Sequence, residues 1–231
     1  MDQSPAFVLH VRPFRETSRL IDFFTPDFGR VRAVARVKTR RRGASGLPAP
    51  FSLLSIHWVG RSDLKTLRDW EPLGPPFLLQ GHRLYSALYL NEILYRLLHE
   101  SDTQPRLYEL YGEALTALAG TTDLEVILRR FELALLEELG YGIDLAHEAE
   151  SGEALQPCGR YALDPERGLI RTNNRAPGQH TYSGESLLAL GAGHLDKPEV
   201  RRVAKQLLRA ALAVHLGGRP LQSRALFQPP R

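Results

Sequence analysis

The side chains with the clearest chemical potential are the basic residues between positions 30 and 42. This run contains seven Lys and Arg residues and no Asp or Glu; its members are Arg30, Arg32, Arg36, Lys38, Arg40, Arg41 and Arg42. Basic groups at this density bind a phosphate backbone chiefly by releasing condensed counterions, which makes binding salt-dependent and weakly sequence-specific. We therefore predict a nucleic-acid contact here, extended from a neighbouring strand by Arg61, Lys65 and Arg68. A solvated basic face without a partner is the alternative interpretation.

Aromatic side chains in the same region could stack on nucleotide bases. The candidates are Phe14, Phe28, His57 and Trp58. Because most aromatic residues of a small β-barrel belong to its core, the pattern assigns no single one of them to a base.

The sequence lacks the motifs of the common enzyme classes. It has no G-x-x-x-x-G-K-[ST] loop for nucleotide phosphates and no G-x-S-x-G nucleophile elbow. His147 has no second histidine at helical spacing, and Asp22 is a lone acid among strand residues, so neither predicts a metal site. We expect no catalytic residue, no metal and no cofactor; an unrecognised nuclease is the alternative that this reasoning leaves open.

A second set of candidate residues belongs to a helix expected near residues 124–139. One face carries an apolar stripe, with Arg129 and Arg130 beside it; the stripe consists of Leu128, Phe131, Leu135 and Leu139. An apolar groove next to arginines could bind a hydrophobic peptide that ends in a carboxylate. The residue pattern alone favours a simpler interpretation, in which the stripe is core and the arginines are surface.

Strand patterns dominate the first 75 residues. Residues 20–25 and 30–37 flank the turn at 26–29 and predict a hairpin. Val31, Ala33, Ala35 and Val37 are expected on one face of its second strand and the arginines on the other. Further strands are expected near residues 6–11, 51–59 and 64–70. Five short strands suit a closed barrel of the OB-fold type, and an SH3-like barrel fits the pattern nearly as well.

Helical periodicity begins after the predicted boundary at residues 73–76. Helices are expected at 81–99, 105–119, 123–139, 184–191 and 197–215, and residues 145–182 form a loop-rich segment with one short hairpin at 160–171. The fold class is therefore α+β with two domains: an OB-fold barrel at 1–76 and a helical domain at 77–231 with a small loop-rich insert.

The distribution of charge separates these two parts. The net charge is +4, yet residues 1–80 carry 13 basic and 7 acidic residues while the remaining 151 carry 17 and 19. The basic excess lies in the barrel region, as expected for a polyanion-binding module. One cysteine, Cys158, excludes an internal disulfide. No apolar run approaches the roughly 18 residues of a membrane span and no secretory signal opens the chain, so we expect a cytoplasmic, nucleoid-associated protein without membrane contact.

The order and spacing of many short segments resemble the RecO family of recombination mediators. Residues 12–18, Arg-Pro-Phe-Arg-Glu-Thr-Ser, are similar to the first hairpin of that family, and residues 60–67 are similar to the middle of its barrel. Similarity continues along almost the whole chain; the other segments are 6–10, 24–25, 29–32, 50–51, 84–92, 128–142 and 216–227.

The resemblance implies both a fold and a function. It implies an OB-fold followed by a helical domain, binding of single- and double-stranded DNA, and annealing of complementary strands. It also implies two partners, RecR and the C-terminal tail of single-stranded DNA-binding protein, with Arg129 a candidate for the terminal carboxylate of that tail. Such a mediator helps load RecA onto coated DNA. Many members carry a four-cysteine zinc module, of which only Cys158 remains here, so we expect no zinc. An RNA-binding OB-fold protein is a further alternative.

Overall fold

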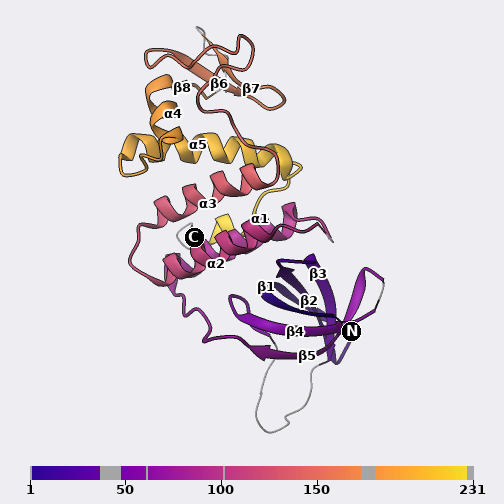
Figure 1. Cartoon of the computed structure of the whole chain (residues 1–231). Helices are drawn as coiled ribbons and strands as arrows, with labels where there is room; N and C mark the ends of the chain where they lie inside the picture. Colours follow the sequence, from indigo (N-terminus) through magenta and orange to yellow (C-terminus); the bar gives the residue numbers. More distant parts are fainter. Residues whose placement is uncertain (1, 37–47, 61, 101, 173–179, 228–231) are drawn as a thin grey trace. The chain divides into compact units, whose positions relative to one another are not determined.

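The structure is a computed structural model that describes residues 2–36, 48–60, 62–100, 102–172 and 180–227 (Figure 1). The chain forms two compact units. The first comprises residues 1–121 and 221–231, and the second comprises residues 122–220. The expected boundary at residue 76 falls inside the first unit, because two helices and the end of the chain group with the barrel.

The first unit is built on a closed five-stranded barrel. Its strands are β1 (Asp2–Phe14), β2 (Ser18–Thr25), β3 (Gly29–Arg36), β4 (Leu53–Val59) and β5 (Leu64–Pro72), in the order β1-β2-β3-β5-β4. The β3–β5 pairing is parallel and the other pairings are antiparallel. This five-stranded arrangement is OB-like. The hairpin predicted from the alternation of residues 20–37 is confirmed by the β2–β3 register, in which Ile21 lies opposite Ala33.

Apolar side chains, from alanine to tryptophan, fill the barrel. The interior cluster consists of Ala6, Val8, Ile21, Phe23, Val31, Ala33, Ala35, Leu54, Ile56 and Trp58. Alternate residues of each strand point inward, so the residues between them must lie on the outer surface of the barrel. This alternation decides which residues of β3 lie on the outside of the barrel.

Two helices cover part of the barrel's outer surface. They are α1 (Gly81–Leu97) and α2 (Pro105–Ala119), which Figure 1 shows side by side next to the strands. The ring of Tyr111 lies 5.0 Å from that of Phe7 on β1, and Phe24 on β2 contacts both Tyr111 and Tyr108. Phe24 is completely buried although it points away from the barrel interior. Barrel and helices therefore share a second apolar core.

A polar anchor fixes α1 on the barrel. The buried amide of Asn91 donates to the carbonyl oxygens of Val8 and Leu9, at 3.4 and 2.9 Å, where a bulge interrupts the β1–β2 register. The same side chain accepts a hydrogen bond from the Tyr111 hydroxyl. A β-bulge leaves backbone carbonyls without ladder partners, and Asn91 supplies the missing donor.

The end of the described chain returns to the first unit as the short 3-10 helix η1 (Gln222–Phe227). The carboxylate of Glu92 on α1 accepts hydrogen bonds from the backbone nitrogens of Gln222 and Ser223, both at 2.8 Å, and from the Ser223 hydroxyl. Burial alone would raise the pKa of Glu92, but these hydrogen bonds lower it. An ionised carboxylate thus holds η1 against α1.

The second unit combines three helices with a small sheet. Its elements are α3 (Leu124–Glu138), β6 (Arg160–Asp164), β7 (Gly168–Arg171), β8 (Tyr182–Ser183), α4 (Gly184–Gly191) and α5 (Pro198–His215). The short hairpin expected at 160–171 is confirmed as β6–β7, and β8 pairs with the other edge of β6. Asp123 caps α3 by accepting from the Glu125 nitrogen at 2.8 Å, and Pro198 begins α5.

Candidate nucleic-acid interface

The alternation of β3 places its arginines on the outside of the barrel. Val31, Ala33 and Ala35 belong to the interior cluster, whereas Arg30 and Arg32 are half-buried and Arg36 is exposed. All three arginines therefore point outward, as the sequence predicts. The structure divides them into two environments, because α1 lies next to Arg30 and Arg32 only.

Arg32 is held by two carboxylates. Its Nε atom lies 3.0 Å from Oδ1 of Asp22, a side chain with no exposed surface, and its Nη1 atom lies 3.2 Å from Oε1 of Glu100. Burial alone would lower the pKa of Arg32, but the hydrogen bond and charge of Asp22, together with the charge of Glu100, raise it. Arg32 is thus paired with one fully buried and one partly exposed carboxylate.

Arg30 is held by the end of α1. Its Nη1 atom donates to the Tyr95 carbonyl oxygen at 2.7 Å, and its guanidinium carbon lies 5.1 Å from the centroid of the Tyr95 ring. Its Nη2 atom lies 3.5 Å from the same Glu100 oxygen that contacts Arg32. Arg30 and Arg32 are therefore brought together around one carboxylate.

Arg36 lies in a more open environment. We call the group of Arg12, Phe14, Arg15 and Arg36 the Arg36 surface. Arg36 and Phe14 both lie opposite Ser18 in the registers of β2 with β3 and β1. The guanidinium of Arg15 lies 5.3 Å from the centre of the Phe14 ring, and Arg12 is exposed. The Arg36 surface therefore combines three cations with one half-buried aromatic ring.

Sequence reasoning did not select Arg12 or Arg15 as binding residues. They belong to the hairpin that places β1 beside β2, and β2 is the neighbour of β3. The backbone of Arg15 has φ 53°, a left-handed conformation that is unfavourable for a residue with a side chain. The signal that could have found them is the motif Arg12-Pro13-Phe14-Arg15, two cations flanking an aromatic residue at a hairpin turn.

The remaining basic residues predicted to bind DNA differ in exposure, and several lie outside the described part of the chain. Lys65 lies on β5 opposite Ala33 and is half-buried, and Arg68 on the same strand is exposed. Five predicted residues lie outside the described part of the chain; they are Lys38, Arg40, Arg41, Arg42 and Arg61.

The aromatic candidates separate in a similar way. Trp58 is 1% exposed and belongs to the barrel core, so it is not available for stacking on a base. Phe28 is 39% exposed, with its ring edge-on to Trp58 at 5.1 Å. His57 and Phe14 are half-buried on the strands.

The two arginines of α3 point in different directions. Arg129 is buried, and its Nη2 atom lies 2.8 Å from Oε1 of Glu132, itself 2% exposed. Its neighbour Arg130 is exposed. The side chains of adjacent helical residues diverge, so the two cations do not form one site. The Nε atom of Arg129 has no acceptor in the described part of the chain.

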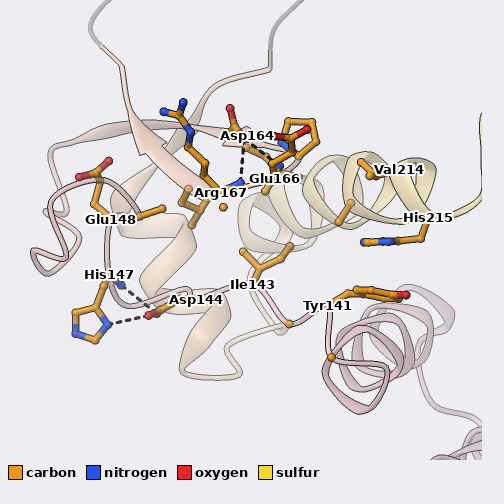
Figure 2. A pocket seen from close by; sticks show the side chains of 18 of the residues that line it. Tyr141, Ile143, Asp144, His147, Glu148, Asp164, Glu166, Arg167, Val214 and His215 are labelled. Carbon is orange, nitrogen blue, oxygen red and sulfur yellow. Dashed lines mark hydrogen bonds and ion pairs between the residues drawn. The ribbon is translucent and has the colours of Figure 1, made fainter.

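A hollow of about 850 Å³ opens on the second unit (Figure 2). Its apolar lining includes Ile143 and Val214, and the ring of Tyr141 stacks on His215 at 3.7 Å. Carboxylates dominate its polar lining; they are Asp144, Glu148, Asp164 and Glu166. An acidic hollow repels phosphates, so this one does not suit a nucleic acid or an acidic peptide tail.

The carboxylates of this hollow mainly organise its loops. Glu148 accepts hydrogen bonds from the hydroxyl and backbone nitrogen of Ser151 and from the backbone nitrogens of Glu150 and Arg171, which lowers its pKa to about 2. Asp144 pairs with His147 at 3.0 Å (Figure 2). Within the described ranges there is no group of three or more His, Cys, Asp or Glu side chains that could hold a metal ion. None of the described helices combines the length and apolar character that a membrane crossing requires.

Comparison with known proteins accounts for the combination of a basic OB-like barrel and a helical unit. Residues 1–76 match the family model described as Recombination protein O N terminal, and residues 78–225 match Recombination protein O C terminal. The chain belongs to the RecO family. Curated DNA repair proteins RecO are similar to this sequence over nearly its full length. The protein from Pseudomonas aeruginosa is 46% identical over 221 residues, 96% of this chain and 92% of that protein.

Other proteobacterial relatives give the same result. DNA repair protein RecO of Pseudomonas putida is 47% identical over 225 residues, covering 97% of this chain and 96% of its own length. That of Tolumonas auensis is 43% identical over 229 residues, covering 98% and 95%. The RecO family membership supports a role in DNA repair and recombination, and neither the family descriptions nor the names of the relatives denote a catalytic activity.

Proposed function

We propose that this RecO protein is a recombination mediator that binds single- and double-stranded DNA and anneals complementary strands. With RecR, it helps load RecA onto DNA coated by single-stranded DNA-binding protein. The observation that carries the proposal is the Arg36 surface, where three cations and an aromatic ring lie on the outside of an OB-like barrel. The OB-fold is a frequent scaffold for oligonucleotide binding, and cations beside aromatic rings are what single strands require.

Annealing follows from the same charges. Two complementary strands repel each other through their phosphates, and a cationic surface that neutralises both backbones lowers this repulsion. Because the phosphate contacts carry no sequence information, one surface serves any pair of strands. No nucleotide hydrolysis is needed for this step.

Tethering to coated DNA is the second part of the proposed mechanism. We propose that α3 binds the acidic, hydrophobic tail of single-stranded DNA-binding protein, with Arg129 or Arg130 pairing with its terminal carboxylate. A guanidinium suits a carboxylate because it offers parallel hydrogen bonds. Tethering raises the local concentration of the barrel near single strands, so weak phosphate contacts become sufficient.

The DNA-binding proposal is tested by fluorescence anisotropy of a labelled single strand across a salt titration. The test variant is Arg12→Ala/Arg15→Ala/Arg36→Ala, and the matched control removes three cations elsewhere: Arg106→Ala/Arg160→Ala/Arg167→Ala. Each lost phosphate contact reduces the slope of log K against log salt by about 0.7, so the test variant should lose about 2. Equal slopes for the two variants would remove the Arg36 surface from DNA binding, and preference for a length-matched RNA would redirect the function to RNA.

The tethering proposal has its own measurement, titration of a tail peptide monitored by calorimetry. Arg130→Ala removes an exposed cation, and Arg129→Lys keeps the charge beside buried Glu132 while removing the planar donor pair. At least one variant should weaken peptide binding by tenfold or more, while DNA binding remains unchanged. Unaltered peptide affinity in both variants would exclude α3 as the binding site.

A further inference from the structure

The first two residues of β3, Gly29 and Arg30, have an unusual neighbour. Along one edge, β3 pairs with β2 from Gly29 to Arg36, and along the other its pairing with β5 begins only at Arg32. Glu100, in the segment that follows α1, forms isolated bridges with Gly29 and Arg30. Because β2 occupies the first edge, Glu100 must lie along the edge that β5 leaves open.

The fit of this segment against β3 is close. A side-chain carbon on Gly29 would lie 2.1 Å from the carbonyl oxygen of Asp102, and φ at Gly29 is 60°, so only glycine suits this position. The close approach places the carboxylate of Glu100 between the two guanidinium groups, with one oxygen 3.5 Å from Arg30 and 3.2 Å from Arg32.

An anion held between two guanidinium groups has the chemistry of a bound phosphate. We infer that Arg30 and Arg32 form a phosphate subsite for the DNA backbone, and that Glu100 occupies the place of the phosphate when no DNA is bound. DNA binding would exchange one anion for another at the same two cations. This inference rests on the proposed DNA-binding function and names a regulating contact within it.

The two arginines keep their positions when Glu100 leaves. Arg32 retains its Nε hydrogen bond to Asp22 at 3.0 Å, and Arg30 retains the Tyr95 carbonyl at 2.7 Å together with the face of the Tyr95 ring. The donors would therefore be preorganised for the incoming phosphate, which reduces the entropy lost on binding.

The exchange is also favoured by the exposure of Glu100. Its side chain is 27% exposed, and that of Arg32 is 26% exposed, so solvent reaches the contact between them. Because solvent reaches part of this ion pair, breaking it costs less than breaking a fully buried pair. By contrast, Asp22 has no exposed side-chain surface and stays paired.

The test compares Glu100→Gln with Glu109→Gln in the full-length protein. Both variants remove one negative charge, but Glu109 is exposed on α2 and pairs with Arg106, away from the barrel arginines. For Glu100→Gln we expect steeper salt dependence of single-strand binding, by about 0.7 in log–log slope, because a phosphate then binds Arg30 and Arg32 without displacing a carboxylate. The affinity gain at 50 mM salt should consequently be about threefold larger than at 200 mM. Glu109→Gln should leave the slope unchanged.

A third variant separates a freed subsite from a simple loss of repulsion. In Glu100→Gln/Arg30→Gln the extra cation is gone, so the steeper slope should return to the wild-type value. A slope that stays steep in this double variant would overturn the inference, since weaker repulsion alone would then explain the gain. Thermal unfolding of each variant verifies that the fold is retained.

The outcomes also distinguish this inference from the function on which it rests. If the wild-type protein binds no DNA at low salt, the proposed function fails. If the wild-type protein binds DNA and Glu100→Gln behaves like Glu109→Gln, only the phosphate subsite is overturned.

Discussion

Replacing Asn91 by Ala should destabilise the first unit by about 3 kcal/mol. Asn91 is 4% exposed, and its amide donates to the carbonyl oxygens of Val8 and Leu9 and accepts from the Tyr111 hydroxyl. Alanine removes the donor that satisfies the bulge of β1 and the acceptor of a buried hydroxyl. Each buried polar group that loses its partner costs about 1–3 kcal/mol, which gives the expected magnitude.

The two tryptophans make this effect measurable in the barrel itself. Trp58 and Trp70 both lie in the barrel strands, so urea unfolding followed by tryptophan fluorescence reports on the first unit. Tyr111→Phe removes only the hydroxyl and should cost about 1 kcal/mol. The two substitutions should be less than additive in the double variant, because they share one hydrogen bond. A loss below about 0.5 kcal/mol for Asn91→Ala would refute the idea that this amide anchors α1 to the barrel.

Three further predictions concern the barrel core, the first residue of β3 and stability at acid pH. Trp58→Ala should cost about 3–5 kcal/mol of unfolding free energy in urea, because it empties the centre of the barrel, whereas exposed Phe28→Ala should cost less than half as much. Gly29→Ala should lower the free energy of unfolding by roughly 2 kcal/mol or more, since its side chain would meet Asp102; an unchanged urea midpoint would contradict the close approach. The pKa of Glu148 is lower in the folded state than its ordinary value of 4.5. Its ionised carboxylate therefore stabilises the folded state above pH 4.5, and this contribution is lost as the pH falls toward 2. Thermal unfolding of Glu148→Gln should therefore depend less on pH below 4.5 than that of the wild type.

Local patterns were enough to predict the five barrel strands, the five α-helices, the β6–β7 hairpin and the α+β fold class, but not β8 or η1. The alternation of apolar and basic residues in 30–37 fixes the inward and outward faces of β3, because a strand has a period of two residues. Helices α2 and α4 have the predicted bounds, since Pro105 and Ser183 start them and apolar residues recur at helical spacing. The choice between an OB-fold and an SH3-like barrel needed the strand order, which depends on pairings between distant residues.

The availability of individual arginines could not be predicted in the same way. The contacts of Arg30 and Arg32 come from Tyr95 and Glu100, more than 60 positions along the chain. The grouping of η1 with the first unit likewise rests on Glu92 meeting Ser223, 131 positions away. The burial of Arg129 has a local signal, an acid three residues later at Glu132, which is the spacing of an ion pair on one helical face.

The packing of α1 against β1 and of α2 against β2 limits where DNA could meet the barrel in the proposed function. OB-folds commonly bind oligonucleotides on the outer face of their second and third strands. Here the outward residues Leu20, Asp22 and Phe24 of β2 are at most 5% exposed, so this half of the face is already used for internal packing. Arg36 is exposed on the remaining half of that face and continues into the rest of the Arg36 surface on β1, whereas the Arg30–Arg32 pair lies at the covered border. A DNA strand bound at the Arg36 surface would therefore reach Arg30 and Arg32 only by displacing Glu100. The salt dependence of binding reports the number of phosphate contacts, so it would show whether Glu100 has been displaced.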